Sequence, residues 1–364
     1  MKNNPLNQLH PAILIPPGNI LGEELAARGM TQREFARRTS RPEQAINEII
    51  HGKKSITHDT AIEFEKVLGI PASIWVNLES NYRLALARVR EQQNLQNATD
   101  QLHEFPIKEM ASRGWIGKAG TGAGKADELL RFFGVASFDA WRLHQEAVGF
   151  RIAEGSKVSE GALSAWVRRG EIQAASIETA PYDAKKFRAA LGSIRGISRS
   201  DAKTFVKTMV ELCGDAGVAV VFVKELPKSG ANGLSRWLSR DKALIQMSLR
   251  LKWADVFWFS FFHEAAHILN HSQKQVFIEF AKAGIDSEQE RVANEFARDF
   301  LIPKSRWFPF IDDNDFSKSS IKRFSKLVEI DTGIIVGRLQ KEKYLPWRTN
   351  LTSLKKQYAW VDDD

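Results

Sequence analysis

The feature that most constrains this chain is the pentapeptide His263-Glu264-Ala265-Ala266-His267, which lies inside an apolar run. The run indicates a buried helix, and two histidines four residues apart project from one face of a helix, about one turn from each other. Both imidazoles can therefore reach one metal ion. Glu264 lies on the flank of that face, where its carboxylate can accept a proton from water without binding the metal. The pattern predicts a zinc site with the chemistry of a hydrolase.

A catalytic zinc takes three protein ligands and keeps a fourth position open, so a third ligand must come from another segment. Glu290 is the best candidate, because residues 290–301 carry apolar residues at helical spacing until Ile302-Pro303 ends the helix. Asn294 would share a face of that helix with Glu290 and could orient a histidine ring or the carboxylate. The sequence thus predicts that two helices supply one metal site.

Each of these residues has a plainer interpretation. A histidine in a core is usually a satisfied polar residue, and a glutamate on a helix is usually solvated. The paired motif together with a second helix that offers a carboxylate and an amide favours a metal. Whether the metal is catalytic or structural stays open, although Glu264 and the lack of thiolate ligands favour catalysis. His271 would lie ~12 Å along the helix from His263, too far to share the ion easily.

Length and composition predict a cytoplasmic protein of more than one domain. A chain of 364 residues with 43% hydrophobic content can form two or three domains. Its single cysteine, Cys213, excludes an internal disulfide framework and is typical of a reducing compartment. The first residues lack an apolar signal core, and residues 256–262, the longest strongly apolar stretch, are too few to span a membrane. The net charge of +8 permits an anionic partner such as DNA.

The amino-terminal part predicts a helix-turn-helix. Residues 31–39 begin with a capping threonine and place Phe35 and Ala36 inward, residues 40–42 form a turn, and residues 43–50 form the second helix. The residues expected to read base edges are Gln44 and Asn47, and those expected to contact phosphates are Arg38, Arg41, Lys53 and Lys54. A small helical bundle with a solvated basic face is the alternative, because Glu43 is unfavourable beside phosphate.

The middle of the chain is mainly helical. Helical patterns occupy residues 81–102, 126–133, 138–148, 159–169, 183–191 and 200–216, and return at 316–328 and 332–341. The Gly-rich stretch 114–125 differs from a phosphate-binding loop, since Ala119 and Ala126 stand where glycine and a magnesium-binding hydroxyl are needed. We interpret it as a linker.

A short sheet is expected directly before the metal helix. Residues 218–223 and 242–249 are β-branched or aliphatic runs, and the turn-rich residues 229–233 separate them. A strand at the edge of a sheet can hold an extended peptide by backbone hydrogen bonds. The expected substrate is therefore a protein.

Two family resemblances follow from these motifs. Residues from about 10 to 90 are similar to the HigA-type antitoxins of the Xre/Cro helix-turn-helix family, through Thr31-Gln32 and residues 46–53, 56–61 and 75–78. Residues from about 217 to 340 resemble an ImmA/IrrE-type metallopeptidase domain, through residues 263–271, 290–297 and Ile302-Pro303. The chain departs from these families at Ala265-Ala266, which should not affect ligation, and at Pro42-Glu43, which puts base contacts in doubt.

The resemblances imply roles for particular residues. His263, His267 and Glu290 would bind Zn²⁺, Glu264 would be the general base, and Gln32 would join the DNA contacts. The implied partners are a palindromic double-stranded operator, bound by a homodimer, and a protein substrate or cognate toxin; no membrane is implied. The expected function is a DNA-binding regulator with a zinc endopeptidase domain. The alternative is a non-catalytic, antitoxin-like repressor whose metal is structural or sensory.

The expected fold is mainly α with a small β-sheet, an α+β arrangement. We expect three parts: a helix-turn-helix domain at residues 1–95, a helical middle region at 96–215, and a zincin-like metallopeptidase domain at 216–364 that contains the metal helix and further helices after it.

Overall fold

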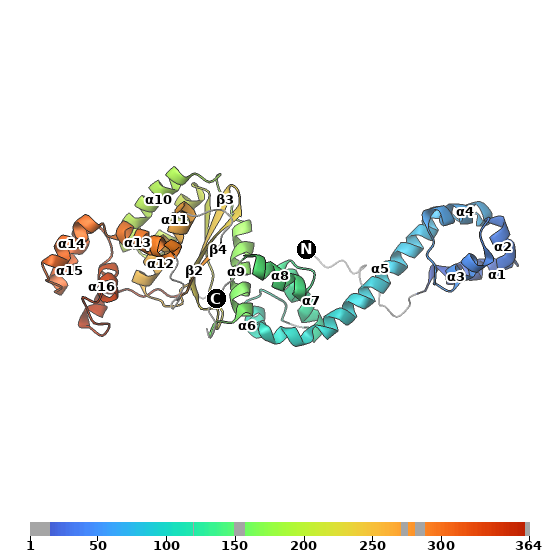
Figure 1. Ribbon diagram of the computed structural model, residues 1–364, viewed down its shortest axis with the longest axis horizontal. Helices are drawn as coiled ribbons and strands as arrows, with labels where there is room; N and C mark the ends of the chain where they lie inside the picture. The colour runs from blue at the N-terminus through green and yellow to red at the C-terminus, as the bar shows by residue number, and fades with distance from the viewer. Residues whose placement is uncertain (1–14, 119, 149–156, 271–275, 281–287, 361–364) are drawn as a thin grey trace. The chain divides into compact units, whose positions relative to one another are not determined.

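The computed structural model describes residues 15–118, 120–148, 157–270, 276–280 and 288–360. The chain divides into two compact units, residues 1–99 and 100–364. Within these described residues, the first unit is helical, and the second combines helices with a four-stranded sheet (Figure 1). The expected fold class, mainly α with a small sheet, is confirmed. His271 lies outside the described residues.

From residue 15 onward, the first unit consists of five helices: α1 (Pro17–Ala27), α2 (Gln32–Arg38), α3 (Glu43–Ile50), α4 (His58–Leu68) and α5 (Ala72–Asn97). The expected helix-turn-helix is present as α2 and α3, and the Thr31 hydroxyl caps α2 by accepting the Glu34 N–H. The buried rings of Phe35, Phe64 and Trp75 pack in series, with centroids 5.0 and 5.6 Å apart. Because Trp75 belongs to this core, α5 begins at Ala72, before the expected residue 81.

The sheet of the second unit contains β1 (Val218–Phe222), β2 (Ala231–Ser239), β3 (Lys242–Met247) and β4 (Val276–Phe280), in the spatial order β1-β3-β2-β4. Strands β1 and β3 run parallel, whereas β2 is antiparallel to both β3 and β4. The expected runs 218–223 and 242–249 correspond to β1 and β3. Strand β2 was not expected, because its first residues, Ala231 to Gly233, have the composition of a turn.

Helices cover both faces of the sheet. On one face α9 (Glu160–Ala175) is tied to the strands by side chains: Trp166 Nε1 donates to the Val223 carbonyl at 3.0 Å, and Gln246 Nε2 donates to the Trp166 carbonyl at 2.8 Å. On the other face lies α12 (Ala254–Asn270), whose buried apolar residues share one hydrophobic core with alternate strand residues such as Val220 and Ile245 (Figure 1). The sheet therefore packs against the helix that carries the histidine pair.

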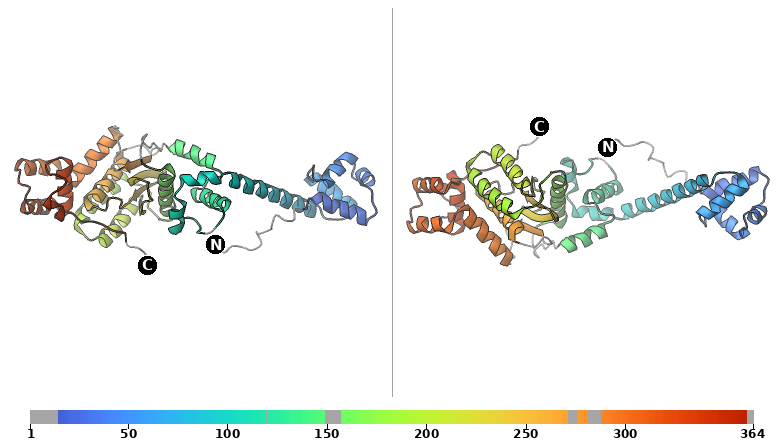
Figure 2. Two further views of the ribbon diagram at one scale, coloured as in Figure 1. Left: turned by 90° about the horizontal axis from the view of Figure 1, so that it is seen from below. Right: turned by 90° about the horizontal axis from the view of Figure 1, so that it is seen from above.

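The remaining helices of the second unit surround this centre. They are η2 (Thr99–Glu104), α6 (Ile107–Ser112), α7 (Gly122–Phe133), α8 (Phe138–Val148), α10 (Ala184–Gly196), η3 (Ile197–Arg199), α11 (Ala202–Gly214), α13 (Glu288–Leu301), α14 (Lys304–Asp312), α15 (Lys318–Val328), α16 (Thr332–Lys341) and η4 (Asn350–Leu354). Figure 2 shows α14 to α16, in orange and red, grouped at one end of this unit. In the described part of the chain, no helix is both long and apolar enough to cross a membrane.

Two expectations about this unit were wrong. The supposed linker 114–125 ends inside α7, because the Thr121 hydroxyl caps the helix by accepting the Gly124 N–H at 3.3 Å. Helix α14 was not expected after Pro303, yet Pro303 is its N-cap residue. A proline blocks the continuation of a helix but is compatible with the first turn of a new one, so the same residue separates α13 from α14.

Candidate metal centre and nucleic-acid interface

The histidine pair lies on a helix that is buried over most of its surface. Trp258, Phe261 and Phe262 of α12 are fully buried in the turns before the motif, and Phe259 is partly buried. His263, Glu264 and His267 are themselves at most 2% exposed. Polar groups buried this deeply require specific partners.

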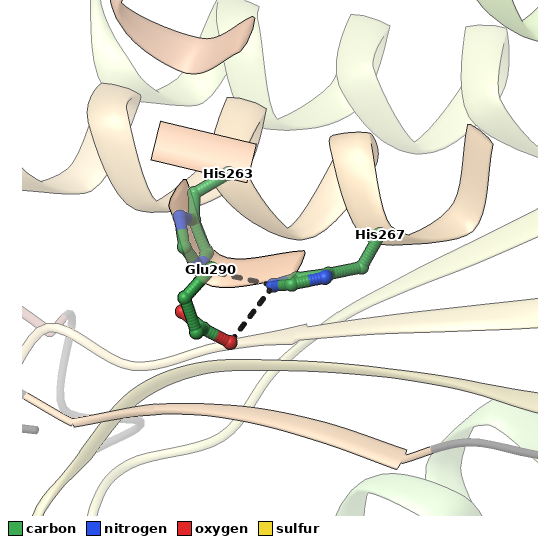
Figure 3. Close-up of side chains that lie close together, drawn as sticks. All are labelled: His263, His267 and Glu290. Atoms are coloured by element: carbon green, nitrogen blue, oxygen red, sulfur yellow. Dashed lines mark hydrogen bonds and ion pairs between the residues drawn. The ribbon is translucent and has the colours of Figure 1, made fainter. Parts of the chain in front are cut away.

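Helix α13 brings Glu290 against both imidazoles (Figure 3). The Glu290 Oε2 atom lies 3.2 Å from His263 Nε2, its Oε1 atom lies 3.4 Å from His267 Nε2, and the two Nε2 atoms are 3.0 Å apart. Ligands about 2.1 Å from a tetrahedral zinc are roughly 3.4 Å from one another. The three side chains thus present their ligand atoms at nearly the separation that one zinc requires, and this donor set fits a catalytic site.

Electrostatics favour the ionised form of Glu290. Burial alone would raise the pKa of its carboxyl group, but hydrogen bonds and positive charge from His263 and His267 outweigh burial and lower the pKa to about 2. Glu290 therefore offers an anionic oxygen to a cation throughout the physiological pH range.

Glu264 faces the sheet through residues that sequence patterns missed. Ser235 of β2 is fully buried and donates its hydroxyl to Glu264 Oε2. Two residues earlier, Gly233 leaves room for the same side chain, since a Cβ atom there would lie 2.9 Å from Glu264 Cγ. A Gly-x-Ser pattern in a turn-like stretch is common and does not by itself indicate this role. The contact also joins residues 29 positions apart, so no local sequence pattern predicts it.

Asn294 occupies a different position from the three candidate ligands. It lies on α13 one turn after Glu290, as expected, but its side chain is exposed. Its assignment as an orienting residue therefore stays a prediction.

The candidate DNA contacts lie on or beside α2 and α3. Gln44 and Asn47 are exposed on α3, Lys53 and Lys54 are exposed directly after it, and Gln32 at the start of α2 is half-buried. Ala45, Ile46 and Ile49 occupy the opposite, buried side of α3. This arrangement leaves the polar face of α3 open to a groove of DNA.

Some of these polar residues also interact with neighbouring acids. Arg38 pairs with Glu34, and Arg41 pairs with Glu63 of α4. Gln44 Nε2 donates to Glu48 Oε1 at 3.0 Å. Arg38 is more than half exposed, so it can reach a phosphate more easily than Arg41, whose side chain is 21% exposed.

Comparisons with known proteins agree with this division of the chain. Residues 21–75 match a helix-turn-helix family model, and residues 250–311 match the model of the IrrE N-terminal-like domain, which is grouped with peptidases. The second match contains His263, Glu264, His267 and Glu290. It runs from just before α12 into α14.

Relatives were found for the amino-terminal part. The virulence-associated protein I of Dichelobacter nodosus is 34% identical over 79 residues, 21% of this chain and 73% of the relative. An uncharacterised helix-turn-helix-type transcriptional regulator of Escherichia coli, YddM, is 32% identical over 71 residues, 20% of this chain and 76% of the relative. The solved structure of an addiction module antidote protein of the HigA family from Coxiella burnetii is 30% identical, covering 25% of this chain and 91% of that one, with a TM-score of 0.20. The chain therefore belongs to the helix-turn-helix family through its amino-terminal unit, and it carries an IrrE-like peptidase-family domain in its second unit.

Proposed function

We propose that this protein is a DNA-binding regulator whose second unit is a zinc-dependent endopeptidase. The observation that carries the proposal is the convergence of His263, His267 and Glu290, together with the buried carboxylate of Glu264 on the helix of the two histidines. A purely structural zinc site needs ligands only, whereas a hydrolase also needs a base next to the metal. Glu264 fills that role without being one of the three ligands.

The residues of the centre have different proposed roles. His263, His267 and Glu290 would hold the zinc, which when bound acts as a Lewis acid and lowers the pKa of a nearby water. Glu264 accepts the proton of the attacking water and then delivers it to the leaving amine. Ser235, by donating to Glu264 Oε2, fixes the orientation of that carboxylate.

The substrate is proposed to be a protein bound at or near DNA, such as another regulator or a cognate toxin complex. A DNA-binding unit in the same chain raises the local concentration of such proteins around the peptidase. We further propose that the first unit acts as a homodimer on a two-fold symmetric operator, since helix-turn-helix proteins read paired half-sites.

The experiment that tests the peptidase is a comparison of protein amino termini in two strains, one producing the wild-type protein and one producing Glu264→Gln. The amide fills the same space but cannot accept the proton, so the expected result is a set of new amino termini found only with the wild type. The strains are grown normally, after DNA damage and under oxidative stress. Identical termini in all three conditions would contradict the peptidase and favour a non-catalytic repressor.

A further inference from the structure

A cavity of about 530 Å³ lies in the second unit at the loop between β1 and β2. None of the proposed metal or catalytic residues lines it. Five of the described residues that line it are basic, namely Arg113, Lys157, Lys224, Lys228 and Arg250, and Glu225 is acidic. Three others are apolar. This volume is in the range of small-molecule sites, which combine an apolar wall with a few polar groups.

Hydrogen bonds hold the walls of the cavity in place. The Arg113 guanidinium donates to the carbonyls of Lys224 and Glu225, at 2.6 and 3.0 Å, and it also pairs with Glu109. The Ser159 N–H donates to the Lys228 carbonyl at 2.8 Å. The loop is thereby tied to α6 and to the start of α9, so the cavity is formed before any ligand binds.

Three of the cations lack a carboxylate partner in the described part of the chain: Lys157, Lys228 and Arg250. Arg113 already pairs with Glu109 and donates to two carbonyls, so its main role is to hold the wall of the cavity in place. Among the described residues, Glu225 is the single acid of the lining. Positive charges gathered around one cavity repel each other, and an anion that enters the cavity relieves this repulsion.

The backbone of Lys228 adds a second, independent observation. Its φ of 64° lies in the left-handed region, which glycine and asparagine tolerate far better than lysine. Gly230, two residues later, has a φ of 75°. Residues held in unfavourable backbone regions concentrate at ligand-binding positions. The loop thus keeps a long cationic side chain at a position where local conformation alone would select a smaller residue.

We propose that this cavity binds a phosphorylated small molecule of nucleotide size. Arg and Lys side chains are the usual partners of phosphate oxygens, and Lys228 and Arg250 supply them here together with Lys157. The exposed ring of Pro227 supplies an apolar surface against which a base can pack. The loop continues directly into β2, which holds Gly233 and Ser235 against Glu264.

The test is calorimetric titration of the full-length protein with ATP, tripolyphosphate and adenosine. We expect ATP to bind and adenosine not to bind, because the phosphates supply most of the attraction. The double variant Lys228→Asn/Arg250→Gln removes two charges, and asparagine accepts the left-handed backbone, so the fold is kept. This variant should bind ATP at least about tenfold more weakly. Tighter binding of ATP than of tripolyphosphate supports the base contact, and equal binding would remove that part of the proposal.

The matched control is Lys322→Asn/Arg323→Gln, which removes the same two charges from the exposed surface of α15. It should bind ATP as the wild type does, and melting temperatures establish that both double variants are folded. Equal ATP affinity of the wild type and the Lys228/Arg250 variant would overturn the proposal. Binding of a single-stranded oligonucleotide without any binding of ATP would also overturn it, because the site would then belong to a nucleic acid.

Discussion

At the scale of single residues, Gly233 and Ser235 determine how Glu264 is held. The Ser235 hydroxyl fixes one carboxylate oxygen, and the missing side chain of Gly233 makes room for the carbon that carries the carboxylate. Both residues belong to β2, so the strand beneath α12 shapes the space around the proposed base. A base that is displaced by about 1 Å can lose much of its effect on the rate.

Gly233→Ala is therefore expected to impair catalysis more than folding. The added Cβ would lie 2.9 Å from Glu264 Cγ and 3.1 Å from its Oε1, so the carboxylate must move. We expect a loss of cleavage of about a hundredfold with the zinc content retained. The control is Gly192→Ala on α10, where a Cβ meets no atom within 4 Å and cleavage should be unchanged. Full activity in Gly233→Ala would show that the close approach of β2 is unimportant.

Much of the candidate site could be predicted from residue spacing. The interval between His263 and His267 is a local property of a helix, and Glu290 followed from the requirement for a third ligand. The structure brings all three together, as expected. Gly233 and Ser235 could not be predicted, since their role depends on a strand passing beneath a helix 29 residues further along the chain.

At the scale of secondary-structure elements, the start of α12 is held by a buried ion pair. Asp255 Oδ2 lies 2.7 Å from Lys355 Nζ, and both side chains are at most 10% exposed. The neighbouring helix α16 passes closely because Gly337 has no side chain, as a Cβ there would lie 2.2 Å from Asp255 Oδ2. Residues near the end of the chain thus fix the helix that carries the histidine pair.

Gly337→Ala should consequently destabilise the second unit. The methyl group overpacks the contact and pushes Asp255 away from Lys355, which should lower the free energy of unfolding by about 1–3 kcal/mol. Urea denaturation monitored by tryptophan fluorescence measures the change. Gly214→Ala is the matched control, because a Cβ at this position in α11 meets no atom within 4 Å. Equal stability of the Gly337→Ala variant and the wild type would refute the close packing.

The helix-turn-helix leads to a prediction about two kinds of contact. Replacing Lys53 and Lys54 by alanine should weaken binding to every DNA sequence and reduce the salt dependence, because these exposed lysines would neutralise phosphates. Gln44→Ala should instead relax the preference for particular bases. Gel-shift titrations against a promoter library at several salt concentrations separate the two effects. No binding to any DNA at low salt would make this unit a protein-interaction module.

The elements that could be predicted are those with a strong local period or a clear cap. Helices α2, α3, α8 and α16 are close to their expected bounds, and β1 and β3 are aliphatic runs. Strand β2 could not be predicted, since Asn232 and Gly233 have low strand propensity and the pairing with β3 determines their conformation. Helix α14 could not be predicted either, because Pro309 lowers its helix propensity. Its Trp307 is nevertheless buried in the core.

At the scale of the whole molecule, the helix-turn-helix and the candidate metal centre lie in separate compact units. We therefore expect changes in one unit to leave the other activity intact. Glu264→Gln should bind operator DNA with wild-type affinity, and the Lys53/Lys54 double alanine variant should keep its zinc. Gel shifts and elemental analysis of the same two preparations measure both properties. Loss of DNA binding in Glu264→Gln would show that the proposed base also influences the first unit.

The central claim is that the full-length chain holds one zinc ion through His263, His267 and Glu290. Elemental analysis of the purified protein tests it most directly. We expect about one zinc per chain in the wild type and in Glu264→Gln, much less in His263→Ala, His267→Ala and Glu290→Ala, and only a small loss in Asn294→Ala. A wild-type protein free of zinc after growth in zinc-supplemented medium, or full zinc retention in a folded Glu290→Ala variant, would contradict this account of the site.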